Sequence, residues 1–354
     1  MKVKMEKNVF IISTEYHLME AVSYIINSFN SGDYDNYIYQ ISPRDSKRFD
    51  RFKIKYDFIP AHFQLIKYDL GGKYEKEFKD SLKELISQKP ERLFFYDEGH
   101  YWIPYLIKKL RKNNCTICMG PDGSNAYQNE DLTWGYIFKY VYHFLIFIYS
   151  HRLFPPFFTV IKRHHYAYTP GIDELWMEFP EGFNNYYKKK LVEQPVLNNS
   201  QTIEAVSKIF GFKREEVSEE WKNTILLIDN PFGNRAVDKM VEVISDIRKR
   251  YPDYRLYVKA HPGTSQYAID KYSEFGNVVF LGNNYPAELY ILSFKQSIII
   301  SIYSTSMLCN NPDCRFYWLY PMFYGFFDES YNMDNLTNPT RHIISANCSG
   351  DIVL

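Results

Sequence analysis

The sequence predicts an α/β fold in two domains, each built on a doubly wound parallel sheet. The first observation is length, because 354 residues suit two domains. The second is an alternation of short apolar runs, typical of buried parallel strands, with segments of helical apolar spacing. The third is that this alternation occurs twice, on either side of a polar stretch over residues 181–222 that fits surface helices and an interdomain connection.

The first series begins with an apolar run, Asn8–Thr14, that predicts a buried strand. Glu15–Phe29 follows with apolar residues at helical spacing. Further strands are predicted over Tyr37–Ile41, Phe63–Tyr68, Arg92–Tyr96 and Thr116–Met119, and further helices from about Asp45, over Tyr74–Ser87 and over Trp102–Lys112.

The second series starts at a predicted strand, Thr224–Ile228, followed by a helix over Ala236–Arg250. Pro286 opens another helix, at a position that proline favours. Further strands are predicted over Arg255–Lys259, Val278–Leu281, Ser297–Ile302 and, closing the set, Arg315–Leu319. We therefore expect two Rossmann-like domains, residues 1–215 and 216–354, that face each other across a cleft.

An aromatic insertion over residues 136–161 interrupts the first domain. Its longest uncharged stretch, Tyr140–Ser150, is much shorter than the roughly 20 residues that span a bilayer. It fits a buried helix. The alternative is a peripheral contact with the inner membrane, because basic residues such as Arg152 and Lys162 flank it.

Charge and cysteine content exclude several functional classes. Lys+Arg and Asp+Glu both number 42, so no basic excess indicates a nucleic-acid partner. Cys115 and Cys118 form a CxxC inside a predicted strand, without a second metal-ligand pair, which favours buried reduced thiols. The first residues lack the apolar core of a signal peptide, so we expect a cytoplasmic protein. No group of residues has convincing metal-ligand spacing, and we expect no cofactor.

An acidic residue on a tight turn follows the predicted strand Thr116–Met119. Asp122 lies between Pro121 and Gly123, beyond the carboxyl end of that strand, where α/β sheets bind ligands. A carboxylate there is a candidate general base. The alternative is that Asp122 only shapes the turn.

In the second domain, several features suited to a nucleotide follow strands of one sheet. The features are His261-Pro262-Gly263 and Ser304-Thr305-Ser306, with Glu288 in a first helical turn and Phe232-Gly233 in a turn that lets a backbone approach a ligand. Imidazole, hydroxyl groups and helix N-termini bind phosphate, and an acidic residue accepts hydrogen bonds from ribose. Each feature also has a structural explanation, since Ser and Thr cap helices and a first-turn Glu complements the helix dipole. Neither GxxxxGK[ST] nor GxGxxG is present, which disfavours a P-loop NTPase or a dinucleotide enzyme.

Together these motifs resemble the bacterial sialyltransferases of GT-B fold, which carry an acidic D/E-D/E-G motif, an HP motif and a later Ser/Thr pair. The opening Asn8–Leu18 also resembles the start of lipooligosaccharide sialyltransferases, with His17 where glutamine is usual. A second acidic motif, Asp97-Glu98-Gly99, is the runner-up for the base. The matching residues are Asp122-Gly123-Ser124 with Tyr127, His261-Pro262, and Ser304 with Thr305-Ser306.

The resemblance implies an inverting, metal-independent transfer of sialic acid from CMP-sialic acid to a glycan or glycolipid of the bacterial surface (lipooligosaccharide, O-antigen or capsule). His261 and residues 304–306 would hold the donor phosphate, and His261, if protonated, would serve as general acid. Asp122 would deprotonate the acceptor, while His17 and Tyr127 are weaker candidates for acceptor binding. The alternatives are another donor (CMP-legionaminic or pseudaminic acid, CMP-Kdo or a UDP-sugar) and a non-catalytic polysaccharide-assembly protein.

Overall fold

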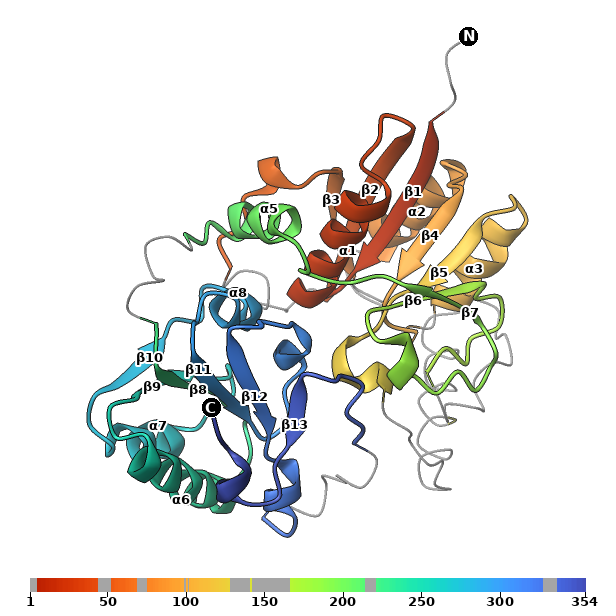
Figure 1. The fold of residues 1–354 in the computed structure, drawn as a ribbon. Helices are drawn as coiled ribbons and strands as arrows, with labels where there is room; N and C mark the ends of the chain where they lie inside the picture. Colours follow the sequence, from red (N-terminus) through yellow and green to blue (C-terminus); the bar gives the residue numbers. More distant parts are fainter. Residues whose placement is uncertain are drawn as a thin grey trace. The chain divides into compact units, whose positions relative to one another are not determined.

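The structure is a computed structural model. It describes residues 5–43, 52–68, 75–98, 100, 102–127, 141, 166–213, 221–326 and 336–354. The chain forms two compact units: unit 1 comprises residues 1–50 and 55–209, and unit 2 comprises residues 51–54 and 210–354. Each unit contains one parallel sheet with helices, so the predicted α/β fold is confirmed (Figure 1). The main segment of unit 2 begins at Phe210, slightly before the boundary expected after residue 215.

Unit 1 contains a seven-stranded sheet in the order β3-β2-β1-β4-β5-β6-β7, with every neighbouring pair parallel. Its strands are β1 (Glu6–Ile12), β2 (Tyr34–Pro43), β3 (His62–Tyr68), β4 (Arg92–Phe95), β5 (Thr116–Met119), β6 (Glu174–Met177) and β7 (Lys190–Glu193). Its helices are α1 (Glu15–Ser28), α2 (Glu75–Ser87), α3 (Trp102–Arg111) and α5 (Ser200–Phe210), the last ending at the first residue of the main segment of unit 2. Short 3₁₀ turns are η1 (Tyr56–Phe58), η2 (Gly123–Tyr127) and η3 (Pro180–Gly182).

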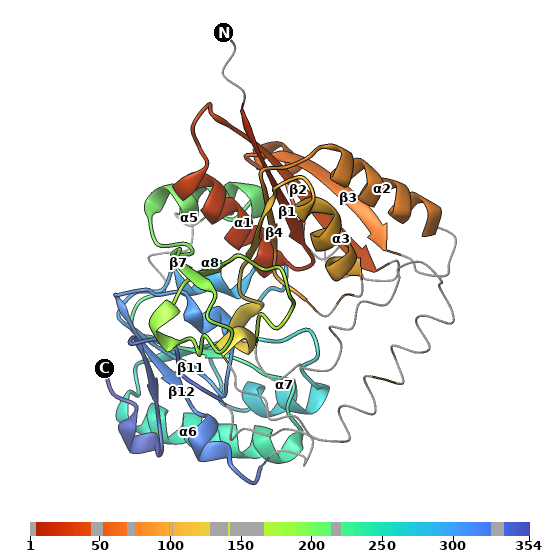
Figure 2. The same cartoon turned by 90° about the vertical axis from the view of Figure 1, so that its right-hand side faces the viewer.

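The strand order of unit 1 determines which face each helix covers. The chain steps outward from β1 to β3 and then returns to β4 on the other side of β1. Because parallel crossovers are right-handed, α1 lies on one face, and α2 and α3 lie on the other (Figures 1 and 2). The order reverses between β1 and β4, which is where such sheets bind ligands.

Unit 2 repeats this winding in a six-stranded parallel sheet of order β10-β9-β8-β11-β12-β13. The strands are β8 (Thr224–Ile228), β9 (Arg255–Lys259), β10 (Val278–Leu281), β11 (Ser297–Ser301), β12 (Cys314–Trp318) and β13 (Ile343–Ser345). The helices are α6 (Asn234–Arg250), α7 (Gln266–Ser273) and α8 (Ala287–Ile291), and the 3₁₀ turns are η5 (Thr305–Leu308), η6 (Tyr320–Phe323) and η7 (Ser349–Asp351). The order reverses between β8 and β11.

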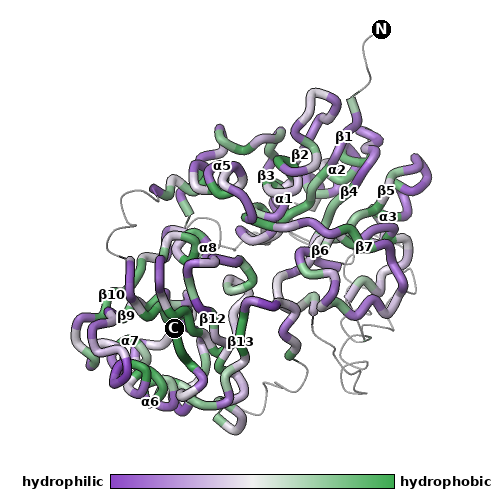
Figure 3. The backbone as a smooth tube through the Cα atoms, in the orientation of Figure 1, coloured by the Kyte–Doolittle hydropathy of each residue, from purple (hydrophilic) through white to green (hydrophobic). Residues whose placement is uncertain are grey.

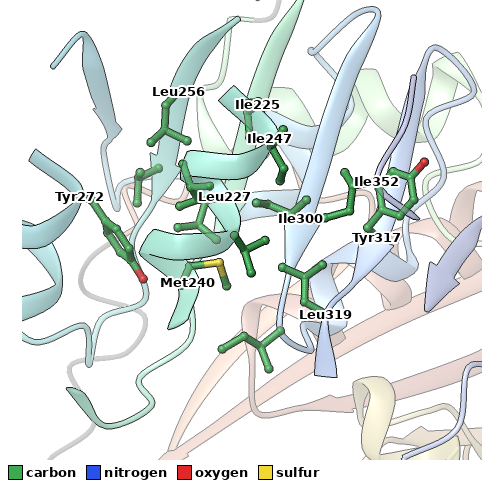
Figure 4. Close-up of a cluster of buried hydrophobic side chains, with 14 of the residues drawn as sticks. Ile225, Leu227, Met240, Ile247, Leu256, Tyr272, Ile300, Tyr317, Leu319 and Ile352 are labelled. Carbon is green, nitrogen blue, oxygen red and sulfur yellow. The ribbon is translucent and has the colours of Figure 1, made fainter. Parts of the chain in front are cut away.

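Aliphatic side chains from the central strands and α6 form the core of unit 2 (Figure 4). Ile225, Leu227 and Ile300 are fully buried in it, and Met240 and Ile247 of α6 pack against them. Hydrophobic stretches concentrate in the central strands of unit 2, whereas hydrophilic stretches are frequent in the connections (Figure 3). Burial on both faces explains why continuous apolar runs predicted these strands correctly.

Three strands lie outside the sequence prediction. β7 falls within the polar stretch over residues 181–222, where the sequence indicated surface helices and a connection, and β6 lies just before that stretch. β13 follows the strand expected to close unit 2. β7 is only half-buried at a sheet edge and β13 is three residues long, so neither leaves a continuous apolar run. The helix predicted from Asp45 and nearly all of the insertion over residues 136–161 lie outside the described residues.

Cys115 and Cys118 are buried free thiols, as expected. Burial raises the pKa of the Cys115 thiol to about 12, which leaves it unreactive. Among the residues that the structure describes, no helix is both long and apolar enough to cross a membrane.

Candidate active site

Three loops of unit 2 meet at the carboxyl edge of its sheet. They follow β8, β9 and β11, which are neighbours in the sheet. The loop after β8 contains Phe232 and Gly233, the loop after β9 contains His261-Pro262-Gly263, and the loop after β11 contains residues 304–306. The structure thus brings together three of the four features predicted for donor binding, because neighbouring parallel strands end at the same edge.

Two polar residues at the end of β8 tie these loops together. Asp229 is buried and accepts hydrogen bonds from the Thr264 hydroxyl and, at 2.9 Å, from the Tyr272 hydroxyl. Asn230 accepts a bond from Ser301 Oγ at 2.8 Å and donates one to the Tyr303 carbonyl oxygen at 2.9 Å. Burial raises the pKa of Asp229, and the two hydroxyl groups oppose that shift. The sequence analysis overlooked both residues, although each directly follows a predicted strand.

His261 is exposed and presents a defined ring nitrogen. Its Nδ1 accepts a hydrogen bond from the Gly263 N–H at 3.0 Å, so the proton of the neutral ring lies on Nε2. A Cβ atom at Gly263 would lie 3.3 Å from both His261 Nδ1 and Pro231 Cβ, so glycine allows the loops after β8 and β9 to pack closely. The loop therefore presents an N–H donor at the sheet edge, suitable for a phosphate oxygen.

The Ser/Thr motif is arranged differently from the prediction. Ser304 Oγ caps its own 3₁₀ turn by accepting the Ser306 N–H at 3.3 Å, so this amide is already used. The half-buried hydroxyl groups of residues 304–306 remain candidates for phosphate contact.

Glu288, Phe232 and Gly233 complete the predicted donor set. Glu288 is buried in the first turn of α8, and α8 contacts η5, so it lies in the same part of unit 2 as Ser304. Phe232 packs against the apolar core. Gly233 caps α6 with φ of −62°, a conformation that other residues also adopt, so its backbone does not require glycine.

In unit 1, Asp122 lies beside His17 at the carboxyl edge of the sheet. His17 Nε2 is 2.9 Å from Asp122 Oδ1. His17 follows β1 and Asp122 follows β5. The His17 side chain is 2% exposed, whereas that of Asp122 is 41% exposed. Asp122 is therefore accessible to a substrate while it is held from behind by a buried imidazole.

Close packing behind Asp122 depends on Gly120. A Cβ atom on Gly120 would lie 2.5 Å from Tyr96 Cε1 and 3.1 Å from the Tyr24 hydroxyl, too close for any other residue without a shift. The Tyr166 hydroxyl bonds to the carbonyl oxygens of Gly120 and Tyr96 and ties the ends of β4 and β5 together. Tyr166 was not predicted as a site residue, because it follows the aromatic insertion over residues 136–161 and no motif marks it.

The runner-up acids have separate environments. Asp97 lies 3.4 Å from His100 Nε2 and is partly exposed, at the end of the neighbouring strand β4. Glu98 is buried, and its carboxylate accepts the backbone N–H groups of Ala167, Tyr168 and Thr169 at 2.7–3.3 Å. Burial raises the Glu98 pKa, while these bonds oppose the shift. Glu98 thus anchors a loop, which disfavours it as a base, whereas Asp97 remains a rival to Asp122.

Tyr127 is placed in the core, contrary to the expectation of acceptor contact. It is 3% exposed, its hydroxyl accepts the Phe179 N–H at 3.2 Å, and its ring contacts Phe179 and Phe183. Burial also raises its pKa. The D-G-S-x-x-Y spacing therefore positions a packing residue.

Two further carboxyl groups belong to the same region of unit 1, where Glu20 interacts with both Asp122 and Glu178. Glu20 is fully buried on α1, three residues after His17, and burial raises its pKa well above the ordinary value, with Glu178 and Asp122 adding to the shift. Burial also raises the pKa of Glu178 to about 8. Among the described residues, no group of three His, Cys, Asp or Glu side chains is arranged to hold a metal ion.

The residues at these two sheet edges lie within a region that matches a known protein family. The model of the alpha-2,8-polysialyltransferase family matches residues 6–312, which include Asp122, His261 and Ser304. The chain belongs to this family. It is therefore a glycosyltransferase of the bacterial sialyltransferase type, which uses a nucleotide-sugar donor and a glycan acceptor. No curated protein matches the sequence.

Solved structures confirm the GT-B architecture of this polysialyltransferase-family protein. The GT-B domain of a sialyltransferase from Photobacterium damselae matches with a TM-score of 0.53 and 14% identity, over 89% of this chain and 91% of that one. UDP-GlcNAc 2-epimerase from Methanocaldococcus jannaschii matches with a TM-score of 0.52 and 13% identity, over 98% of this chain and 90% of that one. At such identities the likeness concerns the fold alone.

Proposed function

We propose that this protein transfers sialic acid from CMP-sialic acid to a hydroxyl group of a bacterial surface glycan, with inversion and without a metal ion. Membership of the alpha-2,8-polysialyltransferase family supports, as part of this proposal, a terminal sialic acid of the glycan as the acceptor, extended through its 8-hydroxyl group. The observation that carries the mechanism is the exposed Asp122 carboxylate, held by His17 at the ligand-binding edge of unit 1.

The transfer is a single displacement. Asp122 removes the proton of the acceptor hydroxyl as its oxygen attacks the anomeric carbon of the donor. The bond between that carbon and the CMP phosphate oxygen breaks, and the electron pair leaves with CMP. Attack opposite the departing phosphate inverts the configuration.

The second unit stabilises the leaving group. Negative charge develops on the CMP phosphate, where His261 Nε2–H and the hydroxyl groups of residues 304–306 donate hydrogen bonds. The tautomer of His261 supports this role, because its Nδ1 is already an acceptor for Gly263 N–H. The Glu288 carboxylate is proposed to accept hydrogen bonds from the ribose hydroxyl groups.

Assay of the full chain tests this function. The enzyme is incubated with CMP-sialic acid and an α-2,8-linked sialic acid oligomer, with and without EDTA, and free CMP and chain length are measured. We expect longer products in both conditions. CMP-Kdo, the other CMP-nonulosonic acids and UDP-sugars are assayed as donors in parallel. Absence of CMP release from CMP-sialic acid would refute the sialyl donor. Loss of activity with EDTA would refute the metal-independent mechanism.

Three variants assign the residues. Asp122→Asn should bind CMP normally in calorimetry but lose transfer by about 10²- to 10⁴-fold, the usual contribution of a general base. Asp97→Asn is the matched control; if it abolishes transfer and Asp122→Asn does not, Asp97 is the base. His261→Ala should weaken CMP binding, which would also distinguish an enzyme from a non-catalytic assembly protein.

A further inference from the structure

The hydrogen bonds of His17 determine which of its nitrogens carries the proton. The Ser13 backbone N–H donates to His17 Nδ1 at 3.2 Å, so Nδ1 is an acceptor. The proton of the ring is consequently on Nε2, which lies 2.9 Å from Asp122 Oδ1 and donates to it. A proton on Nδ1 would point at the Ser13 N–H and break this hydrogen bond.

The ring of His17 is also fixed in orientation. It stacks on Tyr96 with ring centroids 4.8 Å apart and an interplanar angle of 14°. Its backbone N–H is bonded to the Thr14 hydroxyl, the N-cap of α1, at 3.1 Å. Three strand ends therefore contribute to one pair: His17 follows β1, Tyr96 follows β4 and Asp122 follows β5.

Buried titratable groups surround this pair. Asp122 contributes to the raised pKa of both Glu20 and Tyr166, so its negative charge favours their neutral, protonated forms. The titratable groups that interact with one another around it are Tyr16, Glu20, Tyr24, Tyr96, Asp97, Glu98, Tyr127, Tyr166 and Glu178. The His17 N–H, 2.9 Å from Asp122 Oδ1, stabilises the charged form of the carboxylate.

We infer that His17 is a positioning residue for the general base, and not an acceptor-binding residue. Its Nε2–H fixes the rotation of the Asp122 carboxyl group and favours the ionised form, which is the form that removes the acceptor proton. This inference rests on the proposed function for its catalytic consequence, but the geometry of the pair stands independently of it.

Two substitutions distinguish the hydrogen bond that His17 donates from the packing of its ring. His17→Phe preserves an aromatic ring against Tyr96 and removes the donor; His17→Gln restores an N–H near the position of Nε2. We expect His17→Phe to lower kcat by about 10- to 100-fold, the usual value of a hydrogen bond to a charged group, with the donor KM unchanged. The acid limb of its pH–rate profile should move to higher pH, because the carboxylate loses a bond that favours its charged form. His17→Gln should recover most of the loss.

The chain supplies matched controls in two other His–Asp pairs. His62 lies 3.3 Å from Asp35 and stacks on Tyr37, but it begins β3 and so lies at the opposite edge of the sheet. His62→Phe should leave activity and pH profile unchanged. His100→Phe removes the partner of Asp97 and should also leave the acid limb in place. If His17→Phe behaves like His62→Phe, or if only His100→Phe shifts the profile, the inference is wrong.

A readout without turnover distinguishes failure of this inference from failure of the proposed function. In the ¹⁵N-histidine spectrum of the full chain, the signal lost in His17→Gln should show the Nε2–H tautomer, and Asp122→Asn should shift it. An Nδ1–H tautomer would overturn the inference even in an active enzyme. Conversely, the expected tautomer in a protein that releases no CMP would refute the sialyltransferase proposal while leaving the pair intact.

Discussion

At the scale of single residues, carboxyl groups of similar appearance in the sequence have different tasks. Asp122 is exposed and bonded to one imidazole, whereas Glu98 is buried and bonded to three backbone N–H groups. The literal D/E-D/E-G motif thus contains a structural anchor as its second acid. Only the partners of each carboxylate reveal this difference.

Removing the Glu98 anchor should destabilise unit 1. Glu98→Ala leaves the N–H groups of Ala167, Tyr168 and Thr169 without their acceptor, and we expect a loss of about 2–4 kcal/mol in the free energy of unfolding. Urea denaturation measures this change. Glu77→Ala, at an exposed position of α2, is the control and should cost less than about 0.5 kcal/mol. Equal effects would contradict the anchoring role.

The buried acid Glu178 should make stability depend on pH. Burial raises its pKa from an ordinary value of 4.5 to about 8, with the Val196 N–H opposing the shift. Because the folded state prefers the protonated form, this contribution is fully present below pH 4.5 and is lost as the pH rises through about 8. Glu178→Gln cannot ionise, so its melting temperature should exceed that of the wild type more at pH 8.5 than at pH 5. A constant difference would contradict the shift.

At the scale of elements, glycines in the strand-end loops allow each half of the site to pack. Gly120 permits close packing of the buried Tyr96, and Gly263 lies close to both His261 and Pro231, where a Cβ atom would crowd the two loops. The two positions lie in different units, so substitutions there should affect different steps of the reaction.

Gly120→Ala and Gly263→Ala should therefore separate transfer from donor binding. A Cβ on Gly120 would displace Tyr96, and with it the stacked His17, so we expect transfer to fall at least about 10-fold and stability by about 1–3 kcal/mol. CMP affinity should be unchanged. Gly263→Ala should weaken CMP binding, because its Cβ would crowd His261. Calorimetry with CMP and transfer assays would show whether the effects separate in this way; reversal would contradict the assignment of the two edges.

At the scale of the whole molecule, two sheets of the same winding carry different chemistry. Both reverse strand order beside their first strand, β1 or β8, and both place polar residues at that carboxyl edge. The edge of unit 1 is acidic around Asp122, and the edge of unit 2 presents N–H and hydroxyl donors around His261. The charges thus suit a base in one unit and a phosphate in the other.

Donor binding should consequently protect unit 2 selectively. With CMP bound, amide hydrogen exchange should slow in the loops after β8, β9 and β11, namely residues 229–233, 261–264 and 302–306. The sheet of unit 1 should be unchanged, and His261→Ala should abolish the protection. Protection centred on residues 120–127 would instead place the nucleotide in unit 1.

Apolar patterning and turn residues predicted much of the fold and of the candidate site from the sequence alone. The α/β class, the two-unit organisation and the strand-end positions of Asp122, His261 and Ser304 followed from the sequence, because strands buried on both faces leave continuous apolar runs and parallel strands end at one edge. Exposed or very short edge strands such as β7 and β13 leave no such signal and were missed.

Tertiary structure alone decided the partners. His17 and Asp122 are 105 positions apart, and Glu98 and Ala167 are 69 apart, so no local pattern indicates that they meet. Tyr127, which the motif spacing suggested as an acceptor contact, is buried by residues from a distant segment. The sequence determined which groups reach the sheet edges, and the packing of strands remote along the chain decided which acid is held by an imidazole and which by the backbone.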